Sequence, residues 1–187
     1  MSLLSKLIAS RWIFFKPNKK KILIYDRVSK DFLNIFFNKS DYEVLDVRYE
    51  SINFYVVINT ILKYHFSNFV NNYKKTYMEI VSPKIVVSAI DNDIAFYKLK
   101  DIYEKPKYIC FQNGIRTNDF YIQCKNYIKF TKKKLRADHI FLLGSNEKKR
   151  MEKIIKSEFH ILGSVKNNYY SIKKKNINKK IKSIMYI

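Results

Sequence analysis

Short apolar runs alternate with amphipathic stretches along most of the chain. The run at residues 84–90 is β-branched with almost no polar residue, as expected for a parallel strand covered on both faces, and it is one of six predicted strands. The six strands are residues 21–25, 42–45, 84–90, 108–111, 139–143 and 158–162. Between them, apolar residues recur at helical spacing. The predicted helices are residues 28–38, 53–65, 70–81, a segment from about 94 to 103, and 145–155.

Strands that alternate with helices in this way predict an α/β protein with a Rossmann-like, doubly wound parallel sheet and helices on both faces. We expect three parts: an amphipathic N-terminal segment (1–16), the α/β domain (17–168) and a basic linker that leads into the start of a truncated second domain (169–187). The final residues, SIMYI, have the pattern of another buried strand. Residues 117–136 are polar, aromatic and lysine-rich, which predicts an irregular loop with a short helix.

The first fifteen residues have apolar side chains at helical spacing, interrupted by Lys6 and Arg11. No apolar run there is long enough for a signal peptide or a membrane span. The pattern predicts an amphipathic helix, and it fits two locations equally well. The helix either packs on the domain or lies on an anionic membrane surface, with Arg11 and Trp12 among the headgroups.

Polar residues follow two neighbouring strands of the predicted sheet. Asp91, Asn92 and Asp93 come after residues 84–90, and a carboxylate at a strand end can serve as a general base towards a sugar hydroxyl. Asp91 and Asp93 are therefore the candidate catalytic residues. The alternative is that Asn92 or Asp93 caps the helix that begins near Ile94. Asp26, at the end of the first strand, is open to the same two interpretations.

The second polar cluster follows residues 108–111. Gln112, Asn113 and Arg116 offer donors to hydroxyl or phosphate oxygens, and Gly114 allows a positive φ or a close backbone approach. A plain Asn-Gly turn is the alternative.

Gly163 and Ser164 follow the last predicted strand. They form either a tight strand exit or a place where a ligand approaches an interdomain cleft. With the two polar clusters, they complete the candidate substrate-binding set: Asn92, Gln112, Asn113, Gly114, Arg116, Gly163 and Ser164.

The net charge is +21, and thirteen of these excess positive charges lie in residues 1–21 and 164–187. The body of the chain is only mildly basic, and it has no nucleic-acid-binding motif. We therefore expect no specific nucleic-acid partner. The basic ends favour anionic lipid headgroups or phosphorylated substrates instead.

Several kinds of chemistry are disfavoured. The chain has three glycines and neither a G-x-G-x-x-G nor a P-loop motif, so we expect no nucleotide cofactor. Cys110 and Cys124 lack metal-ligand spacing and are expected to be reduced thiols. His65, His139 and His160 are scattered along the sequence, so no metal site is expected.

Five segments together resemble the amino-terminal half of bacterial surface-carbohydrate biosynthesis transferases of glycosyltransferase-B type. The resemblance spans about residues 16–187 and is carried by KPNKKKILIYD, VSPKIVVSAIDNDIAFYKL, YICFQNGIR, ADHIFLLG and FHILGSVKNN. The QNG sequence also resembles the Q-H-G turn of related polymer transferases, such as glycerophosphate transferases of cell-wall polymers. Asn113 replaces the histidine of that turn, so no histidine-based role is carried over.

The resemblance implies two facing Rossmann-like domains with substrates in the cleft. The amino-terminal domain would hold a carbohydrate acceptor against residues 91–93 and 112–116, with Gly163 and Ser164 near the hinge. A nucleotide-activated sugar or polyol-phosphate donor would bind mostly to the second domain, so this chain is expected to have no transferase activity alone. The resemblance implies a cytoplasmic enzyme, peripheral on the inner membrane face. The alternatives are a sugar-nucleotide epimerase of the same architecture and a non-catalytic basic protein that binds membranes or nucleic acid.

Overall fold

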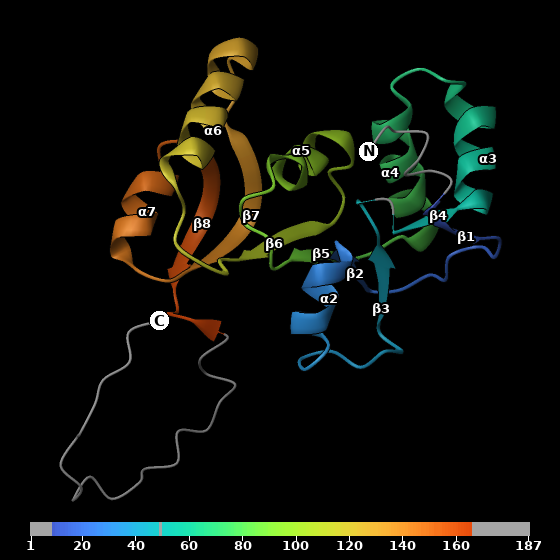
Figure 1. Ribbon diagram of the computed structural model, residues 1–187, viewed down its shortest axis with the longest axis horizontal. Helices are drawn as coiled ribbons and strands as arrows, with labels where there is room; N and C mark the ends of the chain where they lie inside the picture. Colours follow the sequence, from blue (N-terminus) through green and yellow to red (C-terminus); the bar gives the residue numbers. More distant parts are fainter. Residues whose placement is uncertain (1–8, 49, 166–187) are drawn as a thin grey trace, which may run out of the picture.

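The protein is an α/β sandwich built on a six-stranded parallel sheet. The structure is a computed structural model that describes residues 9–48 and 50–165. Strand order in the main sheet is β3-β2-β5-β6-β7-β8, with every neighbouring pair parallel (Figure 1). The strands are β2 (Ile22–Tyr25), β3 (Tyr42–Leu45), β5 (Ile85–Ser88), β6 (Lys107–Phe111), β7 (Leu135–Leu142) and β8 (Ile155–Ile161). The predicted Rossmann-like fold class is confirmed.

Helices flank both faces of this sheet, but unequally. Figure 1 shows α2 (Arg27–Leu33) on one face and α5 (Ile94–Ile102) on the other. The α5 face carries the larger core cluster, to which α4 (Phe69–Val81), α6 (Asn118–Thr131) and α7 (Ser145–Met151) also contribute buried residues. Helix α3 (Phe54–Tyr64) packs against α4. The face under α2 has a smaller cluster, formed by residues 22–44 and 85–111.

Only the end of the predicted N-terminal amphipathic helix can be compared with the structure, and there residues 11–13 form a strand. Residues 1–8 lie outside the described part of the chain. Arg11–Ile13 form strand β1, which pairs in parallel with β4 (Ser51–Asn53) as a separate two-stranded sheet. Both strands have only three residues, too few for a period of two to stand out against the helical pattern.

Helix α6 (Asn118–Thr131) occupies most of residues 117–136, where an irregular loop with only a short helix was predicted. Its inward residues are Phe120, Tyr121 and Cys124, with Tyr127 and Ile128 partly buried behind them. That spacing is helical. This helical spacing was not recognised among the lysines and tyrosines of the segment, because tyrosine occurs at both buried and exposed positions.

Two other predicted helices are shorter than expected. Helix α2 ends at Leu33, and Phe36 is 54% exposed rather than packed inward. Helix α7 ends at Met151, Ile155 begins β8, and the N-cap is Gly144 rather than Ser145. Cys110 and Cys124 are buried free thiols.

The predicted linker and second-domain start fall mostly on residues 166–187, which lie outside the described part of the chain. Within the residues that the structure describes, no helix combines the length and the apolar content needed to cross a membrane.

Candidate functional site at the carboxyl edge of the sheet

The winding direction of the sheet reverses between β2 and β5. The chain first adds β3 on one side of β2 and then crosses to β5 on the other side. In open parallel sheets, ligands bind outside the carboxyl ends of the strands at such a switch point. Asp26 follows β2 directly, and Asp91 to Asp93 follow β5. The topology therefore places Asp26 and Asp93, on neighbouring strand exits, at the favoured position for a ligand.

Asp26 has a backbone conformation that is unusual for a residue with a side chain. Its φ is 76°, and its side chain is only 2% exposed. Oδ1 accepts a hydrogen bond from the Val28 amide at 2.9 Å, which caps α2. Oδ2 accepts one from Arg48 Nε at 2.6 Å. Non-glycine residues at positive φ cost of order 1–3 kcal/mol and cluster at functional sites.

Asp93 joins the ends of β2 and β5 in one polar network. Its Oδ1 accepts from the Ala95 amide at 2.8 Å, so Asp93 is the N-cap of α5. Its Oδ2 accepts from the Tyr25 hydroxyl at 2.9 Å, and Lys74 Nζ lies 3.5 Å from the same hydroxyl. Burial lowers the pKa of Lys74, whereas the nearby Asp93 carboxylate acts in the opposite direction. Burial is the main cause that raises the pKa of Tyr25, and the nearby Asp93 carboxylate raises it further.

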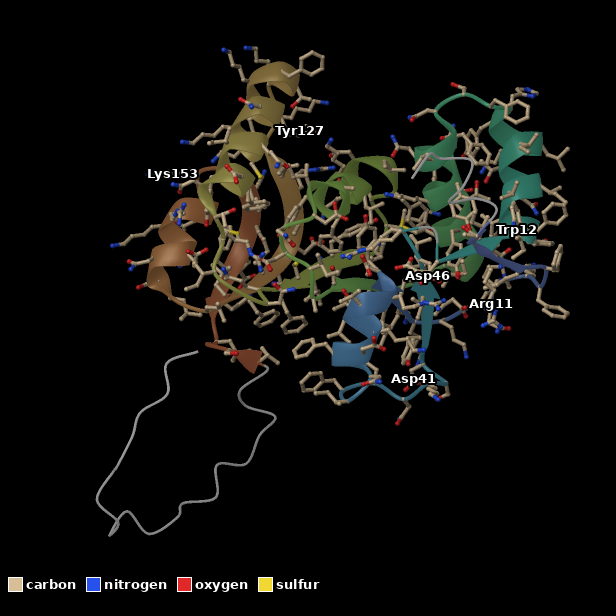
Figure 2. All side chains as sticks on the ribbon, in the orientation of Figure 1. Arg11, Trp12, Asp41, Asp46, Tyr127 and Lys153 are labelled. Carbon is tan, nitrogen blue, oxygen red and sulfur yellow. The ribbon has the colours of Figure 1, made fainter. Side chains whose placement is uncertain are left out.

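Two cavities lie beside Asp46, and the larger one includes Lys74 of this network in its lining. The larger, about 330 Å³, is lined mostly by apolar side chains of β4, α3 and α4, and Lys74 and Asp46 add charge to its wall. Trp12 and Asp46, both labelled in Figure 2, line it from different elements. The second cavity, about 260 Å³, shares Asp46 and also contacts Arg27 and Glu43. Neither is lined by residues 91–93 or 112–116.

Asp46, at the end of β3, is held by an ion pair. Arg27 donates to its carboxylate from Nε at 3.2 Å and from a terminal nitrogen at 2.5 Å, and the Ser51 hydroxyl donates to Oδ2. The Asp46 side chain is 4% exposed, whereas that of Arg27 is 45% exposed. Solvent therefore reaches this pair on its arginine side.

Asp91 forms a buried ion pair with Arg116. Arg116 Nη2 donates to Oδ1 at 2.7 Å, Nε lies 2.7 Å from Oδ2, and the Asn113 amide donates to Oδ1 at 3.1 Å. The two side chains are 0% and 10% exposed. Burial raises the pKa of Asp91 to about 6, and the attraction of Arg116 opposes that rise. This carboxylate faces Arg116 rather than solvent, so Asp93 is the more accessible of the two candidate catalytic residues.

Gln112 is held as firmly as Asp91. Its Nε2 donates to Gly114 O and to Glu147 Oε2, both at 3.0 Å, and its Oε1 accepts from the Leu143 amide at 2.9 Å. Tyr121 also donates to Glu147 Oε2, at 2.9 Å. Gln112 thus links the loop after β6 to the start of α7.

The other predicted substrate-binding residues differ in their surroundings. Asn92 is exposed, while Asn113 and Gly114 are half-buried. Asn113 Oδ1 accepts a hydrogen bond from Arg116, and Gly114 does not adopt a positive φ. Of the two roles considered for Gly114, a positive φ is therefore not adopted.

Gly163 does have a positive φ, +76°, and its amide donates to Leu142 O at 3.2 Å. Gly163 and Ser164 follow β8, which is separated from β5 by two strands. The structure therefore brings Asp91, Asn113 and Arg116 into one hydrogen-bonded group, with Gln112 bonded separately to Gly114, Leu143 and Glu147. It does not bring Gly163 and Ser164 to the switch point.

Nothing in the sequence singled out Tyr25, Lys74 or Arg27, the charged partner of Asp46. Lys74 lies on α4, 49 residues from Tyr25. In the sequence, Lys74 resembles the many other lysines expected to face solvent, and no local pattern distinguishes it.

Two histidines that are far apart in the sequence are neighbours in the fold. His139 Nδ1 and His160 Nε2 lie 3.2 Å apart on neighbouring strands, with Glu158 beside them.

Comparison of the chain with protein-family models, with curated proteins and with solved structures gave no match.

Proposed function

We propose that this domain is the acceptor-side unit of a glycosyltransferase-like enzyme of surface-polysaccharide biosynthesis. The observation that carries the proposal is the half-buried Asp93 carboxylate at the switch point between β2 and β5. Tyr25 holds it, Lys74 lies next to it, and Lys74 also lines the 330 Å³ cavity. A carboxylate outside the carboxyl ends of an open parallel sheet, near a cavity that its lysine neighbour lines, suits a hydroxyl-bearing ligand.

In this proposal Asp93 is the general base. Its carboxylate accepts the proton of an acceptor hydroxyl while that oxygen attacks the anomeric carbon of the donor sugar. The bond between this carbon and the phosphate oxygen breaks, and the electron pair leaves with the nucleotide phosphate. Asn92, which is exposed, contacts further hydroxyls of the acceptor. Asp91, Asn113 and Arg116 fix the two loops through their mutual hydrogen bonds, and Gln112 holds Gly114 within the second loop.

The donor, a nucleotide-activated sugar or a polyol phosphate, would be bound by a second domain. Gly163 and Ser164 would belong to the exit towards that domain, because they end the last strand of this one. This division of labour is the one that the sequence resemblance implies.

Calorimetric titration of the chain with N-acetylglucosamine and with glycerol 3-phosphate tests the proposal. We expect saturable binding that Asp93→Asn weakens by about 10–100-fold, since a hydrogen bond to a charged group contributes about 1.5–3 kcal/mol. Asparagine caps a helix as well as aspartate does, so this variant removes charge without removing the cap. Asp119→Asn, on an exposed helix start, is the control. Equal binding by Asp93→Asn and the parent protein contradicts the role of Asp93.

A sugar-nucleotide epimerase of the same architecture would convert a nucleotide sugar with no acceptor present. Chromatography of UDP-N-acetylglucosamine incubated with the protein, joined to a donor-binding domain, separates the two functions. Product formed without an acceptor favours the epimerase, and product that requires an acceptor favours the transferase.

A peripheral membrane location at the cytoplasmic face has its own supporting observation. Trp12, Phe14 and Phe15 are 39%, 65% and 85% exposed, and they lie between Arg11 and Lys16. Aromatic side chains beside cations suit the headgroup region of an anionic bilayer. Flotation with phosphatidylglycerol vesicles should recover the parent protein, and Phe15→Ser should reduce the recovery. Equal recovery of the variant, or equal binding to neutral phosphatidylcholine vesicles, contradicts this location.

A further inference from the structure

We infer that His139, Glu158 and His160 form a binding site for a divalent transition-metal ion, with Zn²⁺ as the best-fitting ion. The three residues lie on adjacent strands, two on β8 and one on β7. Each offers one ligand atom, and all of these atoms lie within 4.8 Å of one another. The site is distinct from the switch point, because β7 and β8 are the last two strands of the sheet on the side away from β2 and β3.

The spacing of the ligand atoms fits tetrahedral coordination. His139 Nδ1 lies 3.2 Å from His160 Nε2 and 3.3 Å from a Glu158 oxygen, and His160 Nε2 lies 3.6 Å from the other Glu158 oxygen. Ligands bound at about 2.0–2.2 Å around a tetrahedral Zn²⁺ are separated by roughly 3.3–3.6 Å. Each of these separations is therefore close to one edge of a Zn²⁺ coordination tetrahedron, with a different Glu158 oxygen facing each histidine nitrogen.

A register irregularity in β7 creates this arrangement. The core-facing residues of β7 are Leu135 and Ala137, then Ile140 and Leu142, so the alternation slips by one residue before Ile140. Correspondingly, β7 advances from Arg136 to His139 while β8 advances only from Lys156 to Glu158.

Unbroken alternation would point His139 into the core with Leu135. The extra residue turns it to the opposite face instead, directly across from Glu158. Bulges that re-aim a side chain in this way are concentrated next to functional sites.

Neighbouring rings hold the ligands in place. His160 stacks on Phe141 with ring centroids 4.8 Å apart, and Phe141 stacks on Phe111 at 4.9 Å. Phe111 belongs to the core cluster beneath α2, so the stack runs from the core to the ligand. A metal site on a rigid sheet with fixed rings loses less side-chain freedom on binding than one built on loops.

The face that carries these residues is accessible. Among the described residues, the core cluster of that face includes no side chain of β7 or β8. The side chains of His139, Glu158 and His160 are 34%, 66% and 35% exposed. An ion can therefore enter from solvent, and a water molecule can occupy the fourth position.

The ligand set selects the class of ion. Two imidazoles and one carboxylate suit Zn²⁺ and other borderline transition ions, whereas Mg²⁺ and Ca²⁺ prefer oxygen ligands. With three protein ligands and one open position, the set matches Zn²⁺ sites that keep a water ligand. Both cysteines are buried, so they do not compete for added metal.

Titration of the untagged chain with Zn²⁺ against a chromophoric chelator tests the site. We expect one equivalent to bind, and His139→Gln or His160→Gln to weaken binding by at least about 100-fold, because loss of even an outer-shell partner costs ~10–100-fold. His65→Asn, which changes an exposed histidine on another element, should bind Zn²⁺ like the parent. Circular dichroism of each variant without metal establishes that it is folded.

Co²⁺ supplies a second readout that a purely structural histidine pair would not give. Tetrahedral Co²⁺ in the parent chain should produce an intense visible absorption band, which both glutamine variants lose and His65→Asn keeps. The inference is overturned if the folded parent binds no Zn²⁺, or if binding persists unchanged in both glutamine variants. In either case the three side chains form only a hydrogen-bonded pair with an adjacent carboxylate.

Discussion

Replacing Arg116 by methionine would leave the Asp91 carboxylate buried without its counter-ion. Asp91 has no exposed surface, and Arg116 supplies two of its close contacts. Methionine is an unbranched, flexible side chain that fills much of the arginine volume, so the substitution removes charge more than packing. Breaking a buried ion pair from one side costs about 3–5 kcal/mol, because the remaining charge has no compensation.

The cost should depend on pH in a defined direction. Burial raises the pKa of Asp91 to about 6, above the ~3.9 of an unfolded chain. The folded state binds the Asp91 proton more tightly than the unfolded chain does. As the pH rises from about 4 to about 6, loss of this proton therefore lowers the free energy of unfolding by roughly 3 kcal/mol in total. Removing Arg116 raises the pKa of Asp91 further. At pH 5 Asp91 is largely protonated in both proteins, and the cost of the substitution should fall to about 1–2 kcal/mol of lost hydrogen bonding.

Urea unfolding followed by circular dichroism at pH 7.5 and pH 5 measures the difference. Arg136→Met is the matched control, because Arg136 forms surface ion pairs with Asp101 and Glu104. Its loss should cost no more than about 1 kcal/mol at either pH. If Arg116→Met costs the same at both pH values, the carboxylate does not titrate as a buried, arginine-paired group, and the reasoning is wrong.

Three further predictions concern single contacts, each followed by urea unfolding. Asp93→Ala should cost about 1 kcal/mol through loss of the α5 cap, whereas Asp93→Asn should cost little; equal losses would contradict the capping role. Ser29→Ala should cost about 1–3 kcal/mol, because the buried Ala89 amide loses the hydroxyl that accepts its hydrogen bond at 2.9 Å; an unchanged midpoint would contradict this. Gly163→Ala should cost about 1–2 kcal/mol through its positive φ, while Gly144→Ala, with open space around its Cβ position and an extended backbone, should lose only the weaker N-cap preference for glycine and cost less; the reverse order would contradict the assignment.

Much of the fold could be predicted because buried parallel strands leave a strong local signal. The strand at residues 42–45 has the bounds of β3, and those of β2 and β6 differ from prediction by one residue. Elements with a short or mixed hydrophobic pattern were not predicted. Strands β1 and β4 have three residues each, and α6 mixes tyrosine with lysine along its length.

The candidate site was harder to predict, because its contacts join residues far apart in the chain. Asp91 and Arg116 are 25 residues apart, and the Asp93 contact with Tyr25 spans 68 residues. The sequence indicated polar strand ends and left the role of Asp93 as base or cap open; the cap is now observed. It could not indicate the register slip that faces His139 towards His160, since the slip depends on how β7 pairs with β8.

We propose that the carboxyl edge between β2 and β5 binds an acceptor sugar. Amide chemical-shift mapping of the ¹⁵N-labelled chain during titration with N-acetylglucosamine tests this binding. We expect saturable shifts at Asp26, Asn92, Asp93 and Lys74, with little change at His139 and His160. Shifts confined to other surfaces, or no saturable shift at these four amides, would contradict it.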